Sequence, residues 1–231
     1  MPAPVIALWD KLEEFSKTLL GVEDYPAHLR AEGHGNPAAI MAGHEGAKLL
    51  LPSDQPASIE AVYHELLHAH RLWVEAIPEL VILTEDENNW QLVGQIEGDL
   101  EHLVIIPRQV AAGFAETERL QREARKTWET YPWTGNNNAW ARRRTCLMQW
   151  MSHHLLEDAE LSSTMRDCLL SERIFGEADL FRKKALSLVG KKEDLLACAV
   201  RFLKIPMNEV GIRYVDIRNR SFRIVPIRSP R

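Results

Sequence analysis

The chain has 231 residues and a formal net charge of −5 at pH 7, and 45% of its residues are hydrophobic and 26% charged. This composition is ordinary for a globular protein with a well-buried core, and the acidic balance argues against nucleic acid as the main partner of the whole molecule. No apolar stretch approaches bilayer length, no secretory signal is visible, and the three cysteines form no C-x-x-C pair, so we expect a cytoplasmic protein without a membrane partner.

The first third of the chain predicts a helix, a β-hairpin and a second helix. Residues 4–20 place apolar side chains at helical spacing, and Gly21 suits the end of that helix. Residues 38–51 predict two short strands around a glycine-bearing turn. Ser58 can then cap a long helix that runs to about Ile77, where a proline follows.

The remainder of the chain predicts mainly helices. A helix is expected from about Trp90 to Val104, and helical patterning dominates from Val110 to Phe202 except at a turn over 131–138. The tail suggests a terminal β-hairpin around Arg218-Asn219-Arg220. Early strands followed by many helices indicate the α+β class.

The segment His64-Glu65-Leu66-Leu67-His68 spells H-E-x-x-H, the most informative motif in the chain. Two histidines four residues apart lie one above the other on a helix, where they can share one tetrahedral Zn²⁺ ion. The glutamate between them can take a proton from a water molecule on the metal. The bland alternative is that these polar residues lie on the solvent face of an amphipathic helix. Apolar neighbours on the histidine side favour the metal site, because they indicate a helix that is covered on both faces.

A catalytic zinc site usually needs a third protein ligand. The expected second helix offers Glu97 on the shoulder of its apolar stripe and Glu101 one turn further along, which faces more outward. A carboxylate at the edge of a buried face is seldom left unpaired, so Glu97 is favoured as the ligand and Glu101 as an acceptor that orients a ligand imidazole. The reverse assignment stays open, His102 has a weaker claim, and a plain surface run of acids is the remaining alternative.

Together, the His64–His68 motif and the Glu97-Gly-Asp-Leu-Glu101-His102 segment resemble gluzincin metallopeptidases, most closely the minigluzincins. The resemblance covers residues 38–107. It implies a zincin-like core in which His64 and His68 ligate zinc, Glu65 is the general base, and Glu97 or Glu101 completes the site. The expected division is a metallopeptidase core over residues 1–109 and a mainly helical extension with the terminal hairpin over 110–231.

The resemblance implies hydrolysis of peptide bonds in one or a few intracellular protein substrates, while the oligomeric state stays open. One rival is a regulatory protein that holds the metal without turnover, and another is a metal-free interaction protein. The tail arginines could bind an acidic partner or DNA, although nucleic acid is not favoured. These arginines are Arg213, Arg218, Arg220, Arg223, Arg228 and Arg231.

Overall fold

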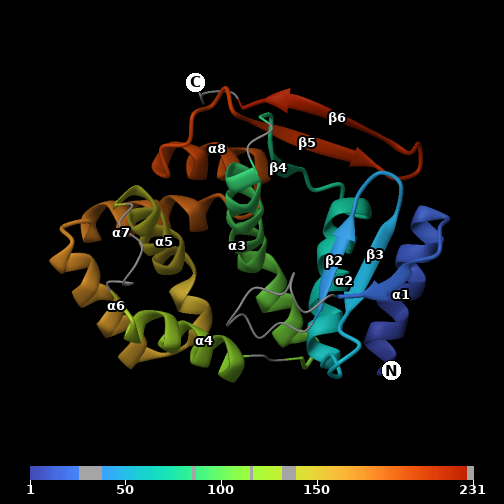
Figure 1. The fold of residues 1–231 in the computed structure, drawn as a ribbon, viewed down its shortest axis with the longest axis horizontal. Coiled ribbons are helices and arrows are strands. Elements are labelled where there is room, and N and C mark those ends of the chain that lie inside the picture. Colours follow the sequence, from blue (N-terminus) through green and yellow to red (C-terminus); the bar gives the residue numbers. More distant parts are fainter. Residues whose placement is uncertain (26–37, 85–86, 115–116, 132–138, 228–231) are drawn as a thin grey trace. The chain divides into compact units, whose positions relative to one another are not determined.

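The computed structural model describes residues 1–25, 38–84, 87–114, 117–131 and 139–227, and it is α+β (Figure 1). The chain divides into two compact units that interleave along the sequence. The first unit comprises Met1–Glu79, Ile105–Ala115 and Ile212–Val225, and the second comprises Leu80–Val104, Glu116–Gly211 and Pro226–Arg231. Both units therefore draw on residues from each side of position 109.

The first unit is built on a small three-stranded sheet with two helices. Its elements are α1 (Ala3–Ser16), β1 (Gly21–Asp24), β2 (Ala39–Ala42), β3 (Ala47–Leu51) and α2 (Ile59–Trp73). The strand order is β1-β3-β2; β1 runs parallel to β3, with Gly21 opposite Lys48, and β2 runs antiparallel to β3, with Ala42 opposite Ala47. The predicted hairpin over 38–51 is confirmed.

The core of the first unit lies between this sheet and the two helices. Val5 and Leu12 of α1, Leu49 of β3 and Leu66 of α2 are almost completely buried in one apolar cluster. Removing such side chains from water is the main stabilising contribution to the unit, at about 25 cal/mol per Å² of apolar surface.

Both helices of the first unit end earlier than the sequence indicated. α1 ends at Ser16 because Lys17 adopts a left-handed φ of 52°. α2 begins as expected, with the Ser58 hydroxyl accepting from the Ala61 N–H at 3.1 Å, but it ends at Trp73. Ala76 has φ 53°, and the Ile77 N–H turns back to the Arg71 carbonyl at 3.0 Å, which closes the helix end before the proline.

The second sheet and a long helix run through both units. The sheet has the order β4-β5-β6 and consists of β4 (Glu79–Ile82), β5 (Val210–Asp216) and β6 (Ser221–Pro226), so the C-terminal hairpin is confirmed. The helix α3 (Glu87–Ala111) is longer at both ends than the predicted helix and continues past Pro107. Proline inside a helix removes one backbone hydrogen bond, but the helix continues through Pro107 for another turn.

The remaining helices belong to the second unit. They are α4 (Thr117–Glu129), α5 (Ala139–Ser152), the short 3₁₀ helix η2 (His153–Leu156), α6 (Ala159–Ser171), α7 (Phe175–Ser187) and α8 (Lys192–Phe202). Leu147, Met151, Met165, Leu169 and Phe181 from this set are fully buried. The helical character predicted for residues 110–202 is confirmed, while 132–138 of the expected turn lie outside the described residues. No helix in the described part of the chain is long and apolar enough to cross a membrane.

Candidate metal centre

The H-E-x-x-H segment lies in the middle of α2, and most of it is buried. His64 is 6% exposed and Glu65 is 8% exposed. The helix is buried on both sides: Leu67 and Leu72 on the histidine side are buried, and so is Leu66 on the opposite apolar stripe. The alternative of a solvent-facing polar stripe is therefore wrong for His64 and Glu65. Buried polar side chains of this kind are retained where they have partners.

The two imidazoles on α2 point their Nε2 atoms at one another. The Nε2 atoms of His64 and His68 are 3.3 Å apart, and the rings meet at 65° with centroids 5.1 Å apart. Two histidine ligands of a tetrahedral zinc ion, each with a Zn–N bond of about 2.0–2.1 Å, have nitrogens roughly 3.3–3.4 Å apart. The side chains therefore already have the separation that a shared ion needs.

Gln109 on α3 fixes the tautomer of His64. Gln109 is 2% exposed, and its side-chain NH₂ group donates to the Glu60 carbonyl at 3.1 Å. A backbone carbonyl only accepts, so the amide oxygen of Gln109 must be the atom that faces His64 Nδ1, at 3.0 Å. His64 Nδ1 therefore carries the proton, and its Nε2 presents a lone pair toward His68. This is how outer residues orient histidine ligands in metal sites.

Glu65 is held beside the edge of β2 that faces away from β3. Its Oε2 accepts from the Ile40 N–H at 3.0 Å. Alternate residues of an antiparallel strand direct their N–H groups to the partner strand. The Gly43 N–H points to the partner strand, since it bonds the Gly46 carbonyl, and Ile40 is an odd number of residues away. The Ile40 N–H therefore points away from β3. The strand lies next to α2 in the ribbon (Figure 1), so the carboxylate sits between the helix and the strand edge.

His102 joins the two α2 histidines as a third metal-type side chain. The ligand-type atoms of His64, His68 and His102 all lie within 4.8 Å of one another. His102 is on α3, two turns before Gln109, so the two residues share one face of the same continuous helix. The helix that holds the Gln109 amide against His64 also carries His102.

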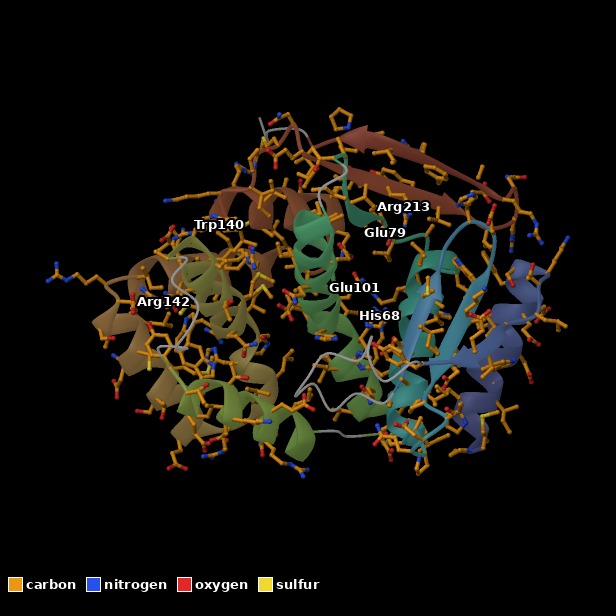
Figure 2. The ribbon with its side chains drawn as sticks, viewed as in Figure 1. His68, Glu79, Glu101, Trp140, Arg142 and Arg213 are labelled. Carbon is orange, nitrogen blue, oxygen red and sulfur yellow. The ribbon has the colours of Figure 1, made fainter. Side chains whose placement is uncertain are left out.

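The predicted third ligands, Glu97 and Glu101, pair with a lysine of α8. The Lys192 Nζ bonds one oxygen of each carboxylate, and the other Glu97 oxygen accepts from the Leu80 N–H at 2.8 Å. Burial raises the pKa of Glu97 in spite of this ammonium. Glu101 projects from α3 and is itself 6% exposed (Figure 2). Their assignment as metal ligands stays a prediction.

Three residues in or beside the candidate site were underestimated or missed in the sequence. Gln109 lies beyond the expected end of its helix, between Arg108 and Val110, and the local sequence gave no signal for it. His102 was recognised but ranked below the carboxylates, because the helical wheel placed it on another side of the expected helix. Lys192 had no signal, because it pairs with residues about ninety positions earlier in the chain.

No family model, curated protein or solved structure matches this chain. The candidate centre therefore depends on the geometry of the residues described above.

Proposed function

We propose that the protein is a zinc-dependent metallopeptidase in which His64 and His68 hold the metal and Glu65 is the general base. The observation that carries the proposal is the 3.3 Å separation of the two Nε2 atoms, with the lone pair of His64 fixed by Gln109. A neutral imidazole with a defined free nitrogen is the form that binds zinc.

His102 is our preferred third ligand, because its ring nitrogen lies close to those of His64 and His68. Glu97 and Glu101 are the alternatives that the sequence favoured. Lys192 already neutralises charge on both carboxylates, which weakens their claim relative to a neutral imidazole. Three protein ligands leave one position for a substrate or water, as in catalytic zinc sites.

The chain's own residues would prepare the reaction. Zinc, when bound, supplies a water of lowered pKa and polarises the carbonyl that is attacked. Gln109 orients His64, and the hydrogen bond from the Ile40 N–H holds the carboxylate of Glu65 in place. Glu65 would take the proton from water and deliver it to the leaving amine.

The substrate class follows from the resemblance to minigluzincins and from the zincin-like arrangement that we propose for the first unit. The β2–β3 hairpin directly precedes α2, and an edge strand beside Glu65 suits an extended polypeptide. We propose one or a few intracellular proteins as substrates.

The decisive experiment compares metal content and casein hydrolysis in wild type and Glu65→Gln. We expect the variant to keep stoichiometric zinc and to lose hydrolysis, since a neutral amide cannot act as a base. His64→Ala should lose the metal. Among His102→Ala, Glu97→Ala and Glu101→Ala, loss of zinc in one variant identifies the third ligand. Turnover retained by zinc-loaded Glu65→Gln would remove this residue from the mechanism.

The second candidate is a metal-binding regulatory protein without turnover. The hydrogen bond from Ile40 to Glu65 favours it, because this bond also suits a purely structural carboxylate that joins strand and helix. Stoichiometric zinc without hydrolysis of any unfolded protein would support this candidate. Absence of stoichiometric metal would contradict both proposals and favour a metal-free interaction protein.

A further inference from the structure

The C-terminal hairpin of the first unit presents an exposed strand. Within the described residues β6 is an edge strand, since the sheet order is β4-β5-β6 (Figure 1). Five of its six residues are exposed, and the sixth is half-buried. Phe222 and Ile224 keep 49% and 42% of their surface accessible. A long, exposed edge with apolar side chains is a template for pairing with another extended chain.

This hairpin is also strongly basic in an acidic protein. Residues 210–226 contain four arginines and a single acidic residue, Asp216, whereas the whole chain has a net charge of −5. In the described hairpin, Arg213 forms an ion pair with Glu79 of β4 at 2.7 Å, and the two side chains point toward one another in Figure 2.

The arginines nearest the exposed strand bond to neutral groups. The Arg223 guanidinium lies over the Tyr214 ring, 3.9 Å from its centroid. The Arg220 guanidinium donates to the Glu45 carbonyl at 3.1 Å and to the Thr18 hydroxyl at 2.9 Å. These contacts fix the side chains without neutralising their charge, so a field of positive potential remains along the edge.

The turn and the exposed strand of the hairpin are held by local contacts. Asp216 accepts from the backbone N–H groups of Arg218 and Asn219, both at 3.1 Å, which holds the turn. Phe222 packs its ring 4.8 Å from that of His44, in the turn between β2 and β3. Preorganisation of this kind reduces the entropy lost when a partner binds.

We propose that β6 is a docking strand for an extended acidic peptide, which adds to its open edge as a further strand. Main-chain hydrogen bonds would give affinity, Phe222 and Ile224 would contact apolar side chains, and Arg220 and Arg223 would attract carboxylates. A second copy of this chain fits less well, because antiparallel self-pairing of β6 brings arginines of both copies together. Nucleic acid fits less well, because the acidic remainder of the chain repels it.

The docking strand does not depend on the proposed metal centre. Its residues lie on β5 and β6, whereas the candidate ligands lie on α2 and α3. Peptide binding should therefore survive treatment of the full chain with a chelator, and failure of one proposal leaves the other untouched.

The test uses the full chain and a fluorescein-labelled peptide of alternating glutamate and valine, with fluorescence anisotropy as the readout. We expect salt-sensitive binding that Arg223→Glu weakens by about tenfold or more. Arg122→Glu, which makes the same charge change on an exposed position of α4, should leave the affinity unchanged. Thermal unfolding of each variant checks that the fold is kept.

Backbone pairing is measured separately by amide hydrogen exchange. Peptide binding should slow exchange in the segment 221–227, which a purely electrostatic association would not do. Several results would overturn the proposal: equal binding of a lysine–valine peptide, unchanged affinity in Arg223→Glu, or unchanged exchange in β6. Tighter binding of duplex DNA at the same salt, or a dimer in sedimentation that Phe222→Ser dissociates, would assign the strand to a different partner.

Discussion

At the scale of single residues, the chain of contacts from Glu60 through Gln109 to His64 decides what the candidate centre can bind. Each link is between groups whose donor and acceptor roles are fixed, except for the imidazole. The Glu60 carbonyl fixes the orientation of the Gln109 amide, and the amide oxygen in turn fixes the proton of His64 on Nδ1. The Nε2 atom of His64 is therefore the nitrogen that keeps a lone pair. In the proposed centre, Gln109 would therefore position the ligand His64 without itself binding the ion.

Replacement of Gln109 by leucine tests this role. Leucine has a similar size but cannot accept from His64 Nδ1, so the ring loses its fixed tautomer. We expect zinc affinity, measured by competition with a chromophoric chelator, to fall about 10- to 100-fold. Gln149→Leu on α5 is the matched control and should keep the affinity of wild type. Equal affinities in the two variants would contradict a positioning role for Gln109.

At the scale of elements, Glu75 joins the end of α2 to α3. Its carboxylate accepts from Arg71 and from Arg108, and it also contacts His70. Burial raises the pKa of Glu75, but the hydrogen bond and charge of Arg108, with the charge of Arg71, outweigh it and hold the pKa below the ordinary 4.5. The carboxylate is therefore more stable ionised in the folded chain than in the unfolded chain.

Glu75→Gln should lower the free energy of unfolding by about 1–2 kcal/mol near neutral pH. Because the folded pKa lies below the unfolded one, this stabilisation is complete above about pH 4.5 and disappears as the pH falls through the folded value. Urea unfolding of both proteins at several pH values measures the difference. If the difference in unfolding free energy persists at the lowest pH values, Glu75 stabilises the fold by packing rather than by its charge.

Lys192 has the corresponding role in the second unit, where it joins α8 to α3. Its side chain is 5% exposed and bonds two carboxylates that are themselves nearly buried. An uncompensated buried charge is strongly destabilising, whereas an exposed ion pair contributes little.

Lys192→Met should therefore destabilise the protein by about 3–5 kcal/mol, because it leaves Glu97 and Glu101 without their common cation. Lys183→Met, which removes an exposed lysine paired with Asp179, is the control and should change stability by about 0.5 kcal/mol or less. Denaturant midpoints compare the two. Similar midpoints for the variants would mean that protons replace the lysine at little cost.

At the scale of the whole molecule, the sequence indicated those features that depend on local spacing. The α2 helix follows from its apolar period and the Ser58 cap, and the two hairpins follow from their turns. Strand β1 was not predicted, because four residues with mostly polar side chains become a strand only by pairing with β3. The interleaved units and the Lys192 pairs depend on long-range contacts, which leave no periodic pattern in the sequence.

The site shows the same limit. Two imidazoles on one helix could be predicted from their spacing, and their Nε2 atoms do converge. Gln109, which sets the tautomer, and His102 come from another helix, whose register against α2 follows from packing rather than from local sequence.

The two strand pairs of the first sheet join residues that are separated by very different lengths of chain, and this difference affects the order in which the chain folds. Ala42 pairs with Ala47 across a tight turn, whereas Gly21 pairs with Lys48 only after the intervening chain has closed into a large loop. Closing the larger loop costs more conformational entropy, so we expect β2 and β3 to pair first and β1 to pair with β3 later. Pulse-labelling hydrogen exchange during refolding would show this as earlier protection of the amides of β2 and β3. Strand β2, whose Ile40 N–H donates to Glu65 of α2, would then form before the sheet is complete.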